Sequence, residues 1–305
     1  MSSKTMSGRF GQLLALGMLL ALVLSACGGS ASSAPIKVGS KDFSEEFIVG
    51  EMYALMLENE GFKVERKHNL GGTPVAQAAI IKGDIDLYPE YTSTGLLTVL
   101  KKAPIADPAQ ILATVKSEYE KQFKLTWLTP SPFNDTNGLA VTQATADKYG
   151  IKTYSDLAAK AAELRFGGPA EFAEREDGIK GLAKTYGGFV PKELKQLGTG
   201  PLRYDALKNG DIDVVVVFTT DARIASDKLV VLQDDKTFYP IYNIAPVVRQ
   251  DTLQSNPKIA DALNKLAPLL TDDVIAGLNA QVDIEGKEFA VVAKAFLDSA
   301  GLLKK

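Results

Sequence analysis

The chain repeats part of itself at an offset of 127 residues. The segment 70–87 aligns without a gap with 197–214, and each copy ends in Gly-Asp-Ile-Asp followed by an apolar residue. Beyond this element Tyr91 lies over Phe218 and Thr94 lies over Asp221. An internal repeat of this kind predicts two similar units that each use the same order of strands and helices.

Each copy alternates strand patterns with helix patterns. Residues 36–39 and 63–67 are predicted strands, and Ser44 is expected to cap a helix that stops at Gly61. In the second copy, Val214 to Val217 is typical of a buried parallel strand. Strands that alternate with helices predict parallel α/β sheets, which bind ligands beyond the carboxyl ends of their strands. Two units with equivalent edges therefore predict a ligand cleft between them.

The length of 305 residues also agrees with two domains. Pro-containing breaks at 129–132 and 238–240 predict that the chain crosses twice between the units. We expect residues 36–128 and 236–305 to form lobe I and residues 129–235 to form lobe II. Three helices are expected to close the chain, at 257–266, 271–282 and 286–300.

Residues 1–26 are typical of a lipoprotein signal peptide. Lys4 and Arg9 precede an apolar run of about fourteen residues, shorter than the ~20 that span a bilayer. The run leads to Leu-Ser-Ala-Cys27, which resembles the bacterial lipobox, where the cysteine receives a diacylglycerol. An ordinary signal peptide with a cysteine near its cleavage site is the alternative. With 27–35 as a flexible tether, we expect an extracytoplasmic protein held on the membrane by a lipid anchor.

Composition excludes several classes of protein. Lys plus Arg is 34 and Asp plus Glu is 37, without a long basic run, which argues against a nucleic-acid binder. One Cys and one His exclude a disulfide framework, a Cys/His zinc site and a Cys-His thiol enzyme. No Gly-x-x-x-x-Gly-Lys-[Ser/Thr] occurs, so this chain is not expected to hydrolyse ATP. We expect no catalytic residues, metal or cofactor, although a two-lobe enzyme is the rival from another class.

Four landmarks together resemble a known family. They are Gly39 to Glu46, the segment 83–94, Thr219 to Ile224, and the segment 234–248 with its Ala-Pro-Val-Val. In combination they resemble the osmoprotectant (glycine betaine/choline/carnitine) substrate-binding proteins of ABC importers, over essentially all of residues 36–305. The resemblance implies a two-lobe, type II-like periplasmic-binding-protein fold with two interlobe crossings and a ligand cleft. It also implies a cognate permease and its ATPase as partners.

The resemblance further implies a box of aromatic rings around a quaternary ammonium group. Such a group has no N–H to donate, so ring faces attract it. Carried over position by position, the rings are Tyr91, Phe218 and Tyr242, whereas Asn137 stands where many members have an aromatic residue. Two outcomes are open: a three-walled box that binds a betaine weakly, or another zwitterion, such as a histidine-derived betaine, that hydrogen-bonds to Asn137.

The carboxylate end of the ligand requires donors. The family pattern places Thr94, Ser40 and Thr136 near that end, and Lys41 adds positive charge. Asp221 either meets a cation or caps a helix. The expected function is to capture glycine betaine, choline, carnitine or a similar solute for import. The alternative is a binding protein or sensor for another small zwitterion or an amino acid.

Overall fold

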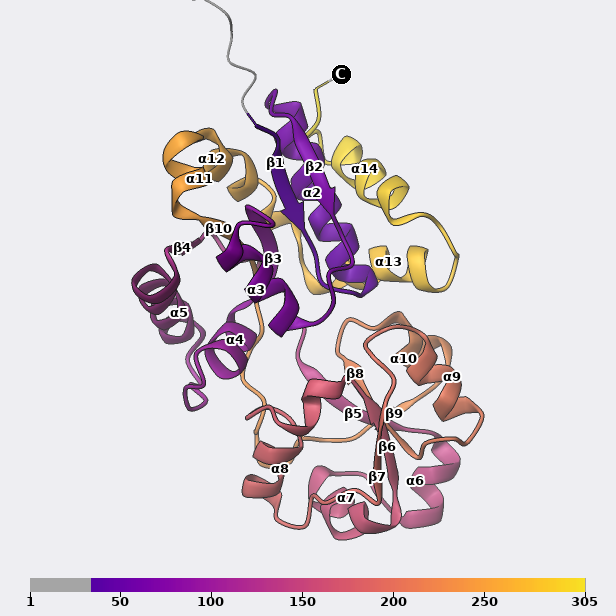
Figure 1. The fold of residues 1–305 in the computed structure, drawn as a ribbon. Helices are drawn as coiled ribbons and strands as arrows, with labels where there is room; N and C mark the ends of the chain where they lie inside the picture. The colour runs from indigo at the N-terminus through magenta and orange to yellow at the C-terminus, as the bar shows by residue number, and fades with distance from the viewer. Residues whose placement is uncertain (1–33, 305) are drawn as a thin grey trace, which may run out of the picture. The chain divides into compact units, whose positions relative to one another are not determined.

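The computed structural model describes residues 34–304, and the chain from Pro35 onward forms one compact unit. It contains two five-stranded sheets, which Figure 1 shows in separate halves of the molecule. The first has the order β2-β1-β3-β10-β4, made of β1 (Ile36–Gly39), β2 (Val64–Lys67), β3 (Leu87–Tyr91), β4 (Leu125–Trp127) and β10 (Ile244–Arg249). The second has the order β7-β6-β8-β5-β9, made of β5 (Asn137–Val141), β6 (Arg165–Gly168), β7 (Glu193–Gln196), β8 (Val214–Phe218) and β9 (Val230–Val231). Cys27 and the predicted signal peptide lie outside the described residues.

The sheets are mixed, which corrects the expectation of purely parallel sheets. β1 pairs in parallel with β2 and β3, and β6 does so with β7 and β8. In contrast, β10 is antiparallel to β3 and β4, and β5 is antiparallel to β8 and β9. The reason is that β5 and β10 each receive the chain from the other sheet, so no helical crossover within one sheet sets their direction.

The two copies of the sequence repeat adopt the same local structure. Asp86 Oδ2 accepts a hydrogen bond from the backbone N–H of Lys37 at 2.8 Å, and Asp213 Oδ2 accepts one from Arg165 N–H at 2.8 Å. In each copy the aspartate after the turn thereby links the third strand to the start of the first. These carboxylates therefore have a structural role, as their position between a turn glycine and a strand predicts.

Helices cover the faces of both sheets. They are α2 (Ser44–Asn59), α3 (Thr73–Lys82), α4 (Thr92–Thr94), α5 (Pro108–Phe123), α6 (Gln143–Tyr149), α7 (Tyr154–Lys160), α8 (Ile179–Tyr186), α9 (Leu202–Lys208), α10 (Ala222–Ser226), α11 (Gln250–Ser255), α12 (Lys258–Asn264), α13 (Asp272–Asp283) and α14 (Phe289–Ser299). A short π-helix follows α4 at Gly95–Val99, and 3₁₀ turns lie at Ala161–Glu163, Ala170–Ala173 and Ala267–Leu269. The C-terminal helices α12, α13 and α14 pack against α2, next to the first sheet (Figure 1).

One expected helix cap is wrong. α2 begins at Ser44, and the residue before it, Phe43, makes no side-chain capping bond. The Ser44 hydroxyl instead donates to Asp283 at the end of α13. α2 therefore begins without a side-chain cap of its own.

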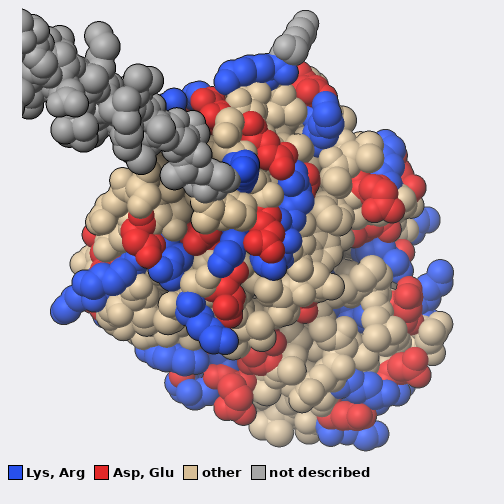
Figure 2. All heavy atoms as spheres, turned by 45° about the horizontal axis from the view of Figure 1, so that its top comes forward, with Lys and Arg blue, Asp and Glu red and all other residues tan. Residues whose placement is uncertain are grey.

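The face in Figure 2 does not favour binding of a polyanion. On the face in Figure 2, basic and acidic side chains alternate without a large region of one sign. Among the described helices, no apolar stretch is long enough to cross a membrane.

Candidate functional site

Two adjoining chambers lie where loops from the two sheets meet. The first, which we call the aromatic chamber, is lined by Lys41, Asp42, Phe43, Gly72, Thr73, Tyr91, Thr94, Asp135, Asn137, Pro169, Glu171, Arg175, Thr199, Phe218 and Tyr242. The second, the acidic chamber, is lined by Asp42, Phe43, Ser44, Glu45, Phe47, Asp135, Thr199, Gly200, Pro201, Tyr204, Phe218, Thr220, Asp221, Arg223, Asn279 and Asp283. Both linings combine residues from the two sheets and their loops, so both chambers lie in the cleft.

Four aromatic rings wall the first chamber. Tyr91 and Phe218 are the last residues of β3 and β8, and Tyr242 lies two residues before β10. The fourth ring, Phe43, was not among the sequence candidates. Its centroid lies 6.3 Å from that of Tyr91 and 5.4 Å from that of Phe218. Phe43 therefore stands between the two rings that the repeat relates.

Lys41 supplies a buried positive charge beside these rings. Its Nζ lies 4.5 Å from the Tyr91 ring centroid, 2.7 Å from Glu90 Oε1 and 3.5 Å from Glu46 Oε1. Burial disfavours the charged amine, but the carboxylates of Glu90 and Glu46 outweigh it and raise the pKa of Lys41. Burial raises the pKa of Glu46 to about 8. Since the short contact is to Glu90, we assign the ion pair to Lys41 and Glu90 and a proton to Glu46 at neutral pH.

A second buried cation comes from the acidic segment between β6 and α8. Asp177 is 1% exposed and accepts from Arg175 Nε at 2.8 Å, from the Tyr242 hydroxyl at 2.6 Å and from Asn137 Nδ2 at 3.3 Å. Burial opposes ionisation of Asp177, but Arg175 holds its pKa below the usual value. The cluster of Glu171, Glu174, Glu176 and Asp177 was expected to be solvated or a helix start, and for Asp177 this is wrong.

Of the other site residues predicted from the sequence, some line a chamber and others do not. Thr94 and Asn137 line the aromatic chamber, each 5% exposed. Ser40 lines neither chamber, and its hydroxyl donates to Lys41 O at 3.0 Å. Thr136 also lines neither, and its hydroxyl donates to Asn134 Oδ1 at 2.8 Å. Asp221 lines the acidic chamber and pairs with Arg203 at 2.6 Å.

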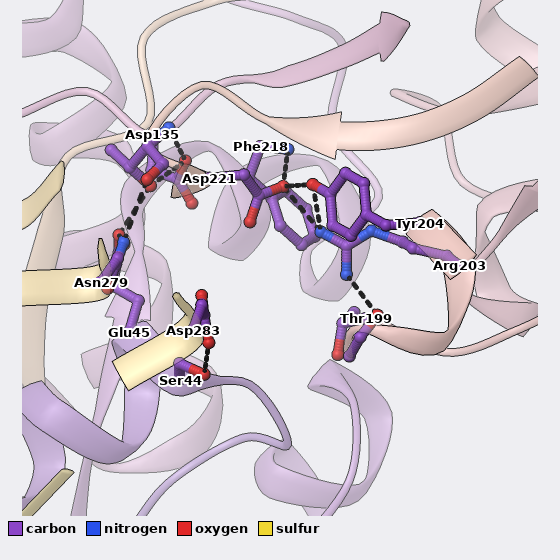
Figure 3. Close-up of polar contacts among 12 residues, drawn as sticks. Ser44, Glu45, Asp135, Thr199, Arg203, Tyr204, Phe218, Asp221, Asn279 and Asp283 are labelled. Atoms are coloured by element: carbon purple, nitrogen blue, oxygen red, sulfur yellow. Dashed lines mark hydrogen bonds and ion pairs between the residues drawn. The ribbon is translucent and has the colours of Figure 1, made fainter. Parts of the chain in front are cut away.

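The acidic chamber is joined to the Tyr91 ring by a hydrogen-bond chain. Glu45 accepts from the Tyr91 hydroxyl at 2.6 Å, from the Thr220 hydroxyl at 2.6 Å and from Asn279 Nδ2 at 2.8 Å. Figure 3 shows Glu45, Asn279 and Asp135 together on one side of the chamber, and Asp221 with Arg203 and Tyr204 on the other. Glu45 belongs to α2 and Thr220 follows β8, so this chain connects the two halves of the fold.

Several of these residues were not identified from the sequence as site residues. Phe43 and Glu45 lie within the family landmark 39–46, so their neighbourhood was a usable signal. Arg175 and Asp177 lie in an acidic stretch that looks solvated, and Asn279 lies in an ordinary amphipathic helix. Among residues 34–304, no group of His, Cys, Asp and Glu is arranged to hold a metal ion.

Residues 34–299 match the family model described as the substrate binding domain of ABC-type glycine betaine transport systems. The chain belongs to this family. The resemblance read from the sequence landmarks is thereby confirmed, and so is a two-lobe binding-protein fold.

Two curated relatives of this family member are named for different ligands. The chain is 39% identical over 269 residues to the ergothioneine transport permease/ergothioneine binding protein EgtU of Helicobacter pylori, and covers 48% of that protein. It is 35% identical over 283 residues to the carnitine transport binding protein OpuCC of Listeria monocytogenes, and covers 91% of it. The chain thus spans about half the length of the first relative and nearly all of the second.

A solved structure shows the same architecture. The crystal structure of a glycine betaine/carnitine/choline ABC transporter protein superposes with a TM-score of 0.68 at 33% sequence identity. The aligned region covers 88% of this chain and 100% of the chain in that crystal structure. The family's members are substrate-binding components of ABC importers, which act outside the cytoplasm.

Proposed function

We propose that this chain captures a small zwitterion with a quaternary ammonium group in the aromatic chamber and delivers it to the permease of an ABC importer. The observation that carries the proposal is the convergence of Phe43, Tyr91, Phe218 and Tyr242 in one buried chamber. Ring faces attract an alkylated ammonium without needing a hydrogen bond from it. Glycine betaine, carnitine, choline and ergothioneine, for which these relatives and this structural neighbour are named, each contain a quaternary ammonium group.

The same chamber offers positive charge for a ligand carboxylate. Lys41 and Arg175 both line it, and each is already held by a buried carboxylate, Glu90 and Asp177 respectively. Their fixed geometry orients a carboxylate without further ordering of long side chains. We assign Thr94 and Asn137 to polar contacts with the ligand in this chamber. Ser40 and Thr136 line neither chamber, and their hydroxyls bond within the adjoining loops. We therefore propose that these two residues hold the loops in place and do not contact the ligand.

The site is enclosed, so we propose that the lobes separate to admit the ligand. Residues 36–128 with 236–305 would move as one lobe and 129–235 as the other, as in hinge closure around a ligand. Thr199 donates to Asp42 Oδ1 at 3.2 Å and Thr220 to Glu45 Oε2 at 2.6 Å, and both bonds connect the two parts. Ligand then shifts the equilibrium toward the closed form, which is the form that we propose docks on the permease and its ATPase.

Titration calorimetry of three variants tests the aromatic assignment. Phe218→Ala removes a half-buried ring and is expected to weaken glycine betaine or carnitine by between about twofold and thirtyfold. Tyr91→Phe keeps the ring and loses only the hydroxyl that Glu45 accepts, so it is expected to lose less affinity than Tyr91→Ala. Tyr149→Ala, on α6 and in neither chamber, is the matched control. Unchanged affinity in Phe218→Ala and Tyr91→Ala contradicts the proposal.

We further propose that Cys27 carries the lipid anchor and that 27–35 is the tether. The support is the apolar run and the Leu-Ser-Ala-Cys sequence. Expression in a bacterial host with a radiolabelled fatty acid tests this. Label is expected in the wild-type chain and not in Cys27→Ala, which should leave the membrane fraction. Label retained in Cys27→Ala contradicts the assignment.

A further inference from the structure

The acidic chamber continues the aromatic chamber. The two share Asp42, Phe43, Asp135, Thr199 and Phe218 in their linings. The acidic chamber has a volume of about 80 Å³, against about 40 Å³ for the aromatic chamber. By the same measure, the acidic chamber is thus the larger of the two. A ligand seated among the rings therefore has room to extend past Phe43.

The wall of the acidic chamber contains four acidic side chains that have no cationic partner among the described residues. Within residues 34–304, no ion pair involves Asp42, Glu45, Asp135 or Asp283. The guanidinium groups nearby are already engaged, Arg203 by Asp221 and Arg223 by Asp205 and Asp227. Burial raises the pKa of Glu45, Asp135 and Asp283, as expected where no cation compensates their charge.

An independent observation points to a missing donor. Asn279 is 3% exposed and lines this chamber from α13. Its Nδ2 donates to Glu45 Oε2 at 2.8 Å and to Thr220 O at 3.2 Å, but its Oδ1 has no hydrogen-bond partner. Burying an acceptor without a donor is unfavourable, so such a group marks a place that a ligand or water completes. Figure 3 shows Asn279 beside Glu45 and near Asp283.

We propose that the acidic chamber binds a nitrogen group with N–H donors, carried by a ligand whose quaternary ammonium and carboxylate lie in the aromatic chamber. Asn279 Oδ1 accepts one N–H, and the carboxyl of Asp283 or Asp135 accepts another. This inference rests on the proposed function and narrows its substrate class to betaines with an N–H-bearing side chain. Glycine betaine and carnitine have no N–H and leave this chamber unused.

A matched pair of ligands tests the inference on the mature chain. N,N,N-trimethylhistidine and N,N,N-trimethylphenylalanine share the betaine head and a ring, but only the first ring has an N–H. By calorimetry near pH 7.5, we expect the histidine derivative to bind at least about tenfold more tightly. Asn279→Leu and Asp283→Asn are each expected to reduce this ratio by at least about threefold. Gln281→Leu, on the same helix and in neither chamber, should keep the wild-type ratio.

Failure of the N–H subsite and failure of the proposed function give different results. A wild-type ratio near one, or a ratio that neither Asn279→Leu nor Asp283→Asn changes, overturns the N–H subsite. If glycine betaine or carnitine still binds, the proposed function stands. If no quaternary ammonium compound binds to a folded wild-type chain, the proposed function itself fails. Circular dichroism and thermal melts establish that each variant is folded, and Asp283→Asn keeps the side-chain shape should Asn279→Leu fail to fold.

Discussion

Glu45 and Asp135 share one hydroxyl group. The Thr220 Oγ1 lies 2.6 Å from Glu45 Oε2 and 2.8 Å from Asp135 Oδ1, and both carboxyls are buried. One hydroxyl has a single hydrogen, so two ionised carboxylates cannot both accept from it. Glu45 receives two further side-chain donors, Tyr91 and Asn279, whereas Asp135 receives only the backbone N–H of Thr220. We therefore place a proton on Asp135, which donates to Thr220 while Thr220 donates to Glu45.

The first prediction is that closure of the lobes on a ligand takes up a proton. Burial, with Glu45 and Asp221 nearby, raises the pKa of Asp135 well above its usual value, and opening would readmit water. The other titratable or charged groups that line the two chambers are Lys41, Asp42, Tyr91, Glu171, Arg175, Tyr204, Arg223, Tyr242 and Asp283. Between the ordinary and the raised pKa, affinity should fall as the pH rises. Binding enthalpies measured in two buffers of different ionisation enthalpy should differ, and the difference should shrink in Asp135→Asn. Identical enthalpies for the wild type contradict proton uptake.

The second prediction concerns stability and Glu46. Its Oε1 is buried without a hydrogen-bond partner, and burial raises its pKa to about 8. A raised carboxyl pKa means that the folded state holds a proton that the unfolded chain releases above its ordinary value of 4.5. The free energy of unfolding should thus fall as pH rises from 4.5 to about 8, by at most about 1.4 kcal/mol per pH unit. In urea unfolding experiments, the free energy of unfolding of Glu46→Gln should decline less over this pH range than that of the wild type. An equal slope in both proteins would contradict the protonated assignment.

The third prediction concerns the pair Arg175 and Asp177. Asp177→Asn leaves the buried guanidinium without its counter-charge, which we expect to cost about 3–5 kcal/mol of unfolding free energy. Tyr242→Phe removes only one hydrogen bond to the same carboxylate and should cost about 1–3 kcal/mol. Chemical denaturation measures both. If Asp177→Asn loses less unfolding free energy than Tyr242→Phe, the ion pair between Arg175 and Asp177 is not what orders the segment between β6 and α8.

The fourth prediction uses the repeat. Asp86→Ala and Asp213→Ala each remove an acceptor for a backbone N–H at the start of a strand, so each should lower the free energy of unfolding by about 1–3 kcal/mol. Asp84 and Asp211 are the exposed aspartates of the same two motifs and serve as matched controls. Their alanine variants should change stability by less than about 0.5 kcal/mol. Similar losses at all four positions would argue against a specific linking role.

The sequence by itself determined the two related units, and it predicted the strand ends at which Tyr91 and Phe218 come to line one chamber. The physical reason is that periodicity and repeated turn residues specify local elements, and strand ends in parallel units meet at one edge. It also led to the family, through landmarks that are each one short continuous segment of the chain.

Only the tertiary structure decided which distant segments meet. Phe43 stands between two rings, Asp177 turns inward to Arg175 and Tyr242, and Asn279 lies 234 residues from Glu45 in sequence yet donates to it at 2.8 Å. These contacts form because two lobes and a C-terminal helix pack together. Packing of this kind depends on which faces bury each other, and no local pattern of residues records it.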